Sequence, residues 1–185
     1  MQPFHETSGV GVVATNDNAA LLVMAAAMFR AYAGEVSAVC GVSLAHQSFE
    51  KELRSLPGAF AAPHGGLWLA LQASAEGTSP LPIGCIAIRP LFKLEGRFDP
   101  AYRPSSCELK RMYVAPESRK KGVGALLLAE ALSMASAVAY ETIYLDTSST
   151  MHDAMRLYRG FGFVPCARYN DDPMDDTLWF EKVLR

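Results

Sequence analysis

The stretch Cys107-Glu-Leu-Lys-Arg-Met-Tyr-Val-Ala-Pro-Glu-Ser-Arg-Lys-Lys-Gly-Val-Gly-Ala-Leu-Leu-Leu128 reads as a strand, a turn and the start of a helix. Side chains alternate along a strand, which predicts two faces. One face would carry Leu109, Arg111 and Tyr113, and the other Glu108, Lys110, Met112 and Val114. Pro116 then ends the strand, because proline has no N–H to donate to a ladder. From Ala125 onward the residues are strong helix formers.

The turn in this stretch has the composition of an anion site. Three positive charges, Arg119 to Lys121, directly precede Gly122-Val123-Gly124 and the helix. Free backbone N–H groups and the positive end of the helix dipole point outward there, and glycine lets an anion approach the backbone. Two nucleotide motifs are excluded. Leu127 stands where G-x-G-x-x-G needs its third glycine, and the chain has no G-x-x-x-x-G-K-S/T.

Two motifs together carry a family resemblance. Arg119-x-x-Gly122-x-Gly124 resembles the pyrophosphate-binding pattern R/Q-x-x-G-x-G/A of the GNAT acyltransferases. Downstream, Ala154-x-x-Leu157-Tyr158-x-x-x-Gly162-Phe163 resembles the A-x-x-L-Y-x-x-x-G-F signature of the same family. They stand in the family's order, with a strand and a helix between them. The resemblance covers roughly Gly65 to the C-terminus.

The resemblance implies an α/β (α+β) fold of the GNAT-like acyl-CoA N-acyltransferase type. We expect a mixed, mostly antiparallel sheet of about seven strands with helices on both faces. In such folds the strand before the glycine turn and the next strand splay apart. The acyl-CoA lies in that gap, with its pantetheine arm along the strand edge. Because the sequence has no linker, internal repeat or low-complexity tract, residues 1–185 are predicted to form a single domain.

Composition and turn signals predict the remaining elements. The expected strands are 10–15, 65–72, 83–89, 107–114, 142–146, 163–169 and 177–184. The expected helices are 19–33, 43–56, 122–139 and 151–160. Asn16, Asp17 and Asn18 supply a turn and an N-cap before the first helix. Its apolar run ends at Arg30, well short of a membrane span, and predicts a core helix.

The resemblance implies acetyl-CoA as cosubstrate. The residues expected to bind it are Met112, Tyr113, Val114, Arg119, Lys120, Lys121, Gly122, Val123, Gly124 and Ala125. The N–H groups of Lys120 through Ala125 would contact phosphate oxygens. The backbone of Met112 to Val114 would hold the pantetheine and donate an N–H to the thioester oxygen. One position departs from the family. Met151 stands where an asparagine often hydrogen-bonds the pantetheine, so the resemblance does not extend to that contact.

Tyr158 matches the family tyrosine that acts as general acid toward the CoA sulfur. A phenol suits this role because the thiolate that it protonates is only moderately basic. The alternative is a tyrosine that packs on the sheet through its ring.

The general base has several candidates. Glu108 lies on the central strand and could take the amine proton directly or through water. It could instead form an ion pair with Lys110 or with Arg111. Asp146 ends a strand beside the expected gap, and His152 has an ordinary pKa near neutrality. The sequence alone does not decide which of these residues is the general base, or whether Glu108 forms an ion pair instead.

The net charge and the cysteines limit the binding partners and the cellular compartment that the sequence predicts. Lys plus Arg is 17 and Asp plus Glu is 19, so the net charge of −2 predicts no nucleic-acid binding. Four cysteines form no C-x-x-C pair, and the N-terminus lacks the pattern of a signal peptide, so we expect free thiols and a cytoplasmic protein. No histidine or cysteine spacing suits a metal. We expect no membrane partner, and a homodimer is an open option.

The sequence thus predicts an N-acetyltransferase that moves an acetyl group from acetyl-CoA to a primary amine by direct attack. The acceptor would be a small molecule or a peptide. Two alternatives remain: a domain that binds acyl-CoA without turnover, and an enzyme that acts on protein N-termini or lysine side chains. The segment from Phe92 to Tyr102 discriminates between acceptors, because a pocket that it closes would favour metabolites and an open groove would favour peptides.

Overall fold

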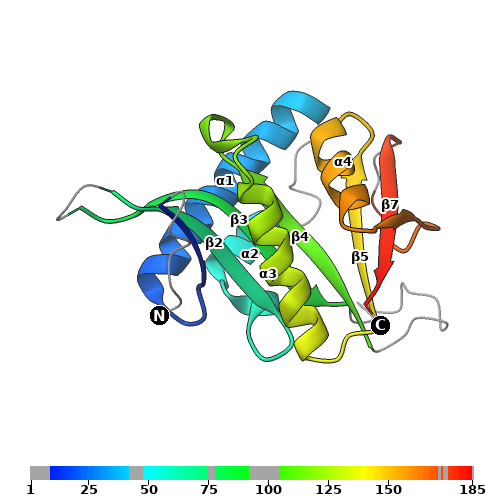
Figure 1. Ribbon diagram of the computed structural model, residues 1–185, viewed down its shortest axis with the longest axis horizontal. Helices are drawn as coiled ribbons and strands as arrows, with labels where there is room; N and C mark the ends of the chain where they lie inside the picture. The colour runs from blue at the N-terminus through cyan, green and yellow to red at the C-terminus, as the bar shows by residue number, and fades with distance from the viewer. Residues whose placement is uncertain are drawn as a thin grey trace.

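The computed structural model describes residues 9–41, 48–74, 78–91, 105–170, 172 and 175–184 (Figure 1). Its elements, in chain order, are β1 (Val10–Ala14), α1 (Ala19–Cys40), α2 (Phe49–Arg54), η2 (Gly58–Phe60), β2 (Gly66–Gln72), β3 (Leu81–Pro90), β4 (Ser106–Val114), η3 (Pro116–Ser118), α3 (Val123–Ala137), β5 (Thr142–Ser148), α4 (His152–Gly160), β6 (Val164–Pro165) and β7 (Thr177–Val183).

All the described strands join one sheet. It has seven strands in the order β1-β2-β3-β4-β5-β7-β6. Every neighbouring pair is antiparallel except β4 and β5, which run parallel. The predicted mixed, mostly antiparallel sheet of about seven strands is therefore confirmed.

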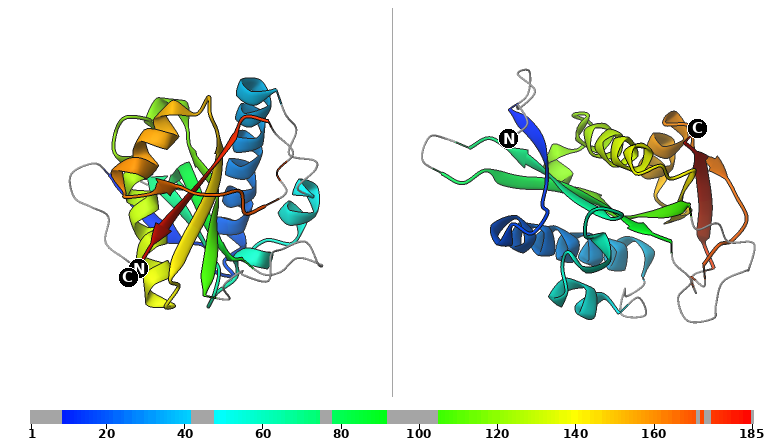
Figure 2. Two further views of the ribbon diagram at one scale, coloured as in Figure 1. Left: turned by 90° about the vertical axis from the view of Figure 1, so that its right-hand side faces the viewer. Right: turned by 90° about the horizontal axis from the view of Figure 1, so that it is seen from below.

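Helices cover both faces of the sheet, as predicted. Figure 2 shows α1 and α2 on one face and α3 and α4 on the other. On the α1 face, the fully buried Phe29 meets Phe60 edge to face, with 5.9 Å between ring centroids. On the α3 face, Leu127 and Leu128 are fully buried against the sheet. Burial of apolar side chains on both faces is what holds the central strands in place.

The parallel pair β4–β5 is short. Its register is Ser106 with Thr142, Cys107 with Ile143 and Glu108 with Tyr144, and no later pair forms. Both strands continue beyond this point, β4 as far as Val114 and β5 as far as Ser148, and Figure 1 shows them diverging. The predicted splay of these two strands is therefore present.

The predicted alternation along β4 is wrong beyond Lys110, because the strand contains a β-bulge. Arg111 and Met112 together oppose the single Ile86 of β3. Arg111 has a φ of +56°, a left-handed conformation that shifts the side-chain register by one. Arg111 and Tyr113 consequently face α1, whereas Leu109 faces α3. Side-chain alternation alone could not reveal the extra residue.

The first helix is longer than predicted. Asn18 caps its start, and its side-chain oxygen accepts a hydrogen bond of 3.1 Å from the N–H of Leu21. The helix continues through Gly34, although the predicted helix ended at residue 33. It ends at Cys40, where Gly41 adopts a left-handed φ of +69°. By length and composition alone this helix could cross a membrane, yet in the fold it packs on the sheet.

Two other boundaries differ from the prediction. The second helix covers Phe49–Arg54, within the predicted 43–56, and residues 42–47 lie outside the described part of the chain. The strand expected at 163–169 is only Val164–Pro165. The N–H of Cys166 still donates to the carbonyl of Trp179 at 3.0 Å. Beyond it, the side chains of Tyr169 and Asn170 form hydrogen bonds with Glu108 of β4 and Asp146 of β5.

Candidate active site

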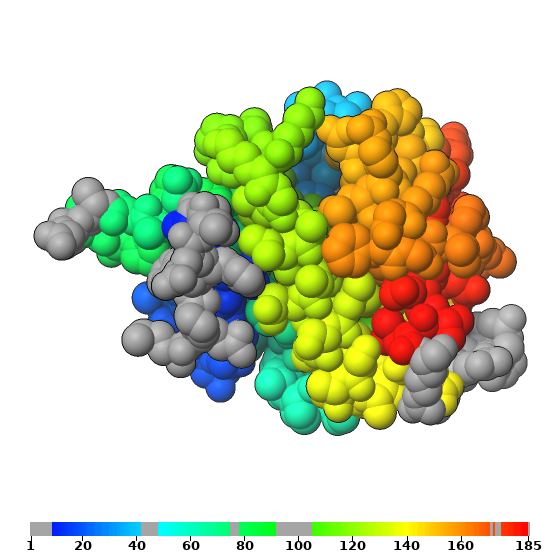
Figure 3. Space-filling model, in the orientation of Figure 1, coloured from blue at the N-terminus to red at the C-terminus, as the bar shows by residue number. Residues whose placement is uncertain are grey.

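The gap between β4 and β5 opens on the surface of the molecule. Figure 3 shows a hollow between the segment that leads into α3 and helix α4, with α1 visible at its floor. Beyond Glu108 the backbone of β4 has no strand partner on this side. The hollow therefore offers an unpaired strand edge to an elongated ligand.

The glycine turn lies at one end of this hollow. Lys120 and Gly122 have left-handed φ values of +60° and +83°, which turn successive N–H groups outward. The first hydrogen bond of α3 runs from the N–H of Leu126 to the carbonyl of Gly122, at 3.1 Å. Within the described residues, the N–H groups of residues 120–125 have no acceptor. Six donors and the positive end of a helix are thus available to an anion.

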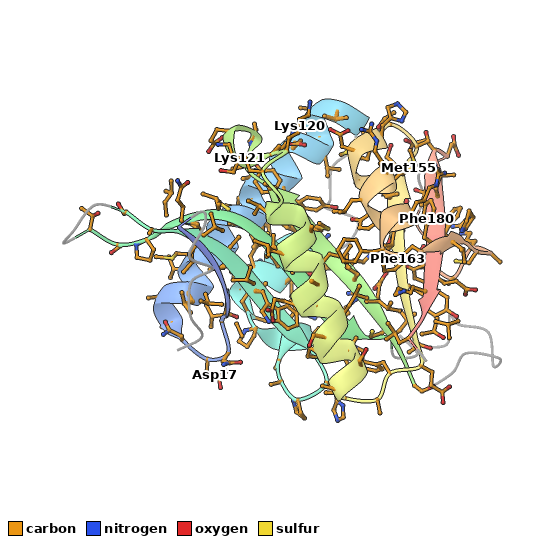
Figure 4. All side chains as sticks on the ribbon, in the orientation of Figure 1. Asp17, Lys120, Lys121, Met155, Phe163 and Phe180 are labelled. Atoms are coloured by element: carbon orange, nitrogen blue, oxygen red, sulfur yellow. The ribbon has the colours of Figure 1, made fainter. Side chains whose placement is uncertain are left out.

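The three basic residues of the turn do different things. Lys120 and Lys121 are exposed at the head of α3 (Figure 4). The side chain of Arg119 is engaged within the protein. Its Nε donates to the carbonyl of Val114 at 2.9 Å, and its guanidinium forms an ion pair with Glu35 of α1. Arg119 therefore fixes the turn to α1, and its neighbours' backbone groups remain free for the anion.

Gly124 lies where the first turn of α3 meets the gap. A Cβ at this position would come within 3.3 Å of Leu157 of α4 and 3.4 Å of Met112 of β4. Such contacts are tighter than side chains usually make. The missing side chain of Gly124 therefore keeps the space between β4 and α4 open at this point.

Tyr158 lies on α4 and is buried in the apolar cluster on the α3 face of the sheet. Its ring packs edge-on against Phe163, with centroids 5.8 Å apart, and only 5% of the residue is exposed. Burial raises the pKa of Tyr158, and the nearby Tyr32 and Asp146 raise it further. The phenol is thus protonated at neutral pH and lies near groups from α1 and β5. Met155, Phe163 and Phe180 form an apolar cluster that supports α4 (Figure 4).

Glu108 is part of a buried ionic network. Its carboxylate is 2.7 Å from the Arg89 guanidinium and 2.9 Å from the Lys110 ammonium, and it accepts a hydrogen bond from Tyr169 at 3.0 Å. Burial alone would raise the pKa of Glu108, but Lys110 and Arg89 outweigh it and lower the pKa to about 2. A carboxylate with this pKa is a weak base at neutral pH. The geometry favours the ion pair with Lys110 over the role of general base.

Asp146 lies across the gap from Lys110. Its Oδ1 accepts hydrogen bonds from Lys110, from the Tyr169 hydroxyl at 3.1 Å and from the Asn170 amide at 3.3 Å. Burial alone would lower the pKa of Lys110, but Asp146 and Glu108 outweigh it and raise the pKa. The other oxygen of Asp146, Oδ2, has no donor among the residues that the structure describes.

Sequence reasoning missed Tyr169 and Asn170. Burial raises the pKa of Tyr169, and the negative charges of Glu108 and Asp146 raise it further, so its hydroxyl stays a donor. Asn170 accepts a hydrogen bond from the Trp179 indole at 2.9 Å, which fixes its amide. The sequence signal was weak: a Tyr-Asn pair before an acidic run reads as the end of a strand.

Other predicted candidates lie apart from this centre. His152 is exposed at the first position of α4, and Met151 packs with the apolar cluster on the α1 face. Residues 92–104, with the predicted acceptor-covering segment, lie outside the described part of the chain. Among the described residues, no group of three or more His, Cys, Asp or Glu side chains could hold a metal ion.

A second depression, of about 290 Å³, lies on the surface away from the gap. It is formed by the C-terminal half of α3 and the segments before β2, with Phe60, Trp68 and Met134 in its lining. It contains neither the glycine turn nor the ionic network. The chemistry therefore belongs to the gap between β4 and β5.

The splayed parallel strands, the glycine turn with its unpaired N–H groups and the buried tyrosine together indicate an acyltransferase. Comparison with known proteins agrees with this class. Residues 27–163 match the model of the acetyltransferase (GNAT) family. The chain belongs to this family of N-acetyltransferases.

Several relatives are similar over most of the chain. An uncharacterized N-acetyltransferase of Schizosaccharomyces pombe is 32% identical over 139 residues, which cover 75% of this chain and 76% of that protein. Among solved structures, a GNAT-family acetyltransferase of Staphylococcus aureus has a TM-score of 0.69 at 17% identity and covers 95% of this chain and 99% of its own. A Salmonella typhimurium structure, named as an acetyltransferase with its cofactor acetyl-CoA, has a TM-score of 0.63 at 15% identity over 96% of this chain and 95% of its own.

Proposed function

We propose that this protein transfers an acetyl group from acetyl-CoA to a primary amine by direct attack of the amine on the thioester. The observation that carries the proposal is the pairing of an unpartnered strand edge with the six outward N–H groups of residues 120–125. A long ligand with phosphates at one end fits this arrangement.

The residues present suit the phosphates and the pantetheine arm of acetyl-CoA. The N–H groups of Lys120 through Ala125 would hold the pyrophosphate, aided by the charges of Lys120 and Lys121. Gly124 leaves the room that the phosphates need between β4 and α4. The backbone of Met112 to Val114 would pair with the pantetheine and donate an N–H to the thioester oxygen. Met151 offers no amide for a further contact.

Tyr158 would act as the general acid. The amine nitrogen bonds to the thioester carbon, the carbon–sulfur bond breaks, and the thiolate takes the phenolic proton of Tyr158. The raised pKa of Tyr158 keeps that proton in place until the thiolate forms. The phenolate then regains a proton from water. An ammonium first loses one proton to water, because only the neutral amine has the lone pair that attacks, and the nitrogen loses a second proton to water after the new bond forms. One of these protons restores the phenol, so an ammonium and acetyl-CoA give an amide, free CoA and one proton.

Asp146 would receive the acceptor. Its Oδ1 is occupied by three donors, which fix the carboxylate, and Oδ2 faces no donor from the described residues. A charge-assisted hydrogen bond from an ammonium to Oδ2 would place the nitrogen beside Lys110 and the end of the gap. Glu108, held by Arg89 and Lys110, would keep this network rigid and take no proton at neutral pH.

Calorimetric titration with acetyl-CoA tests the proposal, with NAD and ATP as matched controls. We expect saturable binding of acetyl-CoA and of CoA, and neither control should compete. An amine screen that monitors release of the CoA thiol then identifies the acceptor. A folded protein that binds acetyl-CoA without turnover of any amine would support the alternative of an acyl-CoA-binding domain. A folded protein that does not bind acetyl-CoA would overturn the proposal.

A further inference from the structure

Arg111 holds the bulge of β4 in a conformation that side chains rarely adopt. Its φ of +56° lies inside a strand, where the backbone is otherwise extended. A non-glycine residue in this region costs free energy, and it persists only when its surroundings impose it. The contacts of Arg111 are therefore informative about what the bulge does.

Contacts on both the backbone and the side chain impose this conformation. The Cys85 thiol donates to the carbonyl oxygen of Arg111 at 3.1 Å. The Arg111 guanidinium donates to both carboxylate oxygens of Glu52, at 2.7 and 3.2 Å. It lies 5.5 Å from the ring centroid of Phe49 and 5.9 Å from that of Tyr32. Only 2% of the side chain is exposed. A bidentate pair between two aromatic rings fixes a guanidinium far more firmly than a surface ion pair does.

These contacts join the bulge to the helices on the α1 face of the sheet. Glu52 and Phe49 belong to α2, and Tyr32 belongs to α1. Burial raises the pKa of Tyr32, although its hydrogen bond with Arg111 acts in the other direction. Tyr32 also raises the pKa of Tyr158, so the two phenols lie near each other. The guanidinium thus connects the helices of the α1 face with the peptide groups that directly follow it on β4.

We propose that Arg111, held by Glu52 and Cys85, is a positioning residue that aims the backbone N–H groups following it on the unpaired edge of β4 at the thioester carbonyl. The inference rests on the proposed function, because it assigns the acetyl group to this part of the gap. The bulge turns Met112 toward α3 and leaves the peptide groups after it on the unpaired edge of β4. Without the contacts from Glu52 and Cys85, the backbone at Arg111 returns to an extended conformation and these donors turn away from the gap.

A purely structural role for the Arg111–Glu52 ion pair predicts a different result for the affinities of acetyl-CoA and CoA. If Arg111 and Glu52 only stabilised the fold, their removal would weaken acetyl-CoA and CoA binding equally. If they aim a donor at the thioester carbonyl, their removal weakens acetyl-CoA binding more, because CoA has no such carbonyl. The ratio of the two dissociation constants therefore separates the roles, and it needs no knowledge of the acceptor.

Glu52→Gln and Cys85→Ala are the test variants, with calorimetry against acetyl-CoA and CoA. For each we expect the affinity for acetyl-CoA to fall about three- to tenfold more than that for CoA, the value of one hydrogen bond. Cys85→Ser, which keeps a donor for the Arg111 carbonyl, should restore most of the difference. Tyr140→Phe is the matched control, since it removes a buried hydrogen bond of 2.9 Å to the His64 carbonyl, away from the gap.

Three outcomes are distinguishable. A selective loss for acetyl-CoA in both variants, with rescue by Cys85→Ser, supports the inference. Equal losses for acetyl-CoA and CoA, or no change in folded variants, overturn the inference and leave the proposed function intact. Failure of the wild-type protein to bind either ligand overturns the proposed function itself. Cys85→Ala changes only one thiol, so it tests the inference even where Glu52→Gln fails to fold.

Discussion

Lys110 and Asp146 form an ion pair across the gap, just beyond the point where the β4–β5 ladder ends. The last paired residues are Glu108 and Tyr144, and the ion pair joins residues two further along each strand. Side-chain charges therefore replace backbone hydrogen bonds at the point where the strands part. The same pair brings a carboxylate to the floor of the proposed acceptor site.

Replacement of Tyr158 by phenylalanine should lower kcat about a hundredfold, because the thiolate loses its proton donor. The Kd of acetyl-CoA should stay near the wild-type value, since the ring that packs on Phe163 is retained. Steady-state release of the CoA thiol and calorimetry measure the two quantities. Tyr140→Phe, a buried phenol outside the gap, is the control. An unchanged kcat would remove the acid role of Tyr158.

Gly124→Glu should abolish acetyl-CoA binding. Its side chain would enter the space beside Leu157 and Met112, and its charge would repel phosphates at the head of α3. Gly160→Glu adds the same group to an exposed helical glycine with open space around it, and should bind normally. Calorimetry and a thermal melt of each variant separate lost binding from lost folding. Tight binding by folded Gly124→Glu would place the phosphates elsewhere.

Asp146→Asn should lower kcat/KM for the amine about ten- to a hundredfold, the value of one charge-assisted hydrogen bond. Binding of acetyl-CoA should change little, because Asp146 lies at the far end of the gap from the glycine turn. Asp153→Asn is the control, since that carboxylate is 71% exposed and pairs only with Arg156. Equal kinetics in wild type and Asp146→Asn would exclude Asp146 as the anchor of the amine.

Glu108→Gln should destabilise the fold at pH 7 by about 3–5 kcal/mol, the usual cost of breaking a buried ion pair. The folded-state pKa of Glu108 is lowered to about 2 from an ordinary 4.5, so its stabilisation is complete above pH 4.5. That stabilisation is lost as the pH falls from 4.5 through 2. Urea denaturation of both proteins across this range measures the difference. A difference that stays constant with pH would contradict the assigned pKa.

Much of the fold could be predicted because local signals agreed with the tertiary structure. Asn18 marks the start of α1, and Pro116 follows the end of β4, since each acts through its own backbone geometry or side chain. The glycine turn was predictable for the same reason. Gly34 misled the prediction of α1, because a single glycine is tolerated where packing holds the helix.

The candidate site was less predictable, because its contacts join residues far apart in the sequence. Glu108 has its partners on β3, on its own strand and at Tyr169, and no spacing rule links these positions. The bulge at Arg111 depends on Glu52 and Cys85, which alternation along β4 does not reveal. The site residues stay predictions, as do the cytoplasmic location, the single domain spanning 1–185 and the homodimer.

Among the residues that the structure describes, three ladder pairs connect strands β1–β4 to strands β5–β7. Because this β4–β5 ladder is so short, side-chain contacts between the two parts of the sheet are needed for the sheet to unfold as one cooperative unit. On the proposed function, a bound cosubstrate touches both parts of the sheet and stabilises the native state by mass action. Hydrogen exchange at β5 and β7 should then slow when acetyl-CoA is added. The bound cosubstrate would thus stabilise the contact between the two halves of the sheet, in addition to supplying the acetyl group.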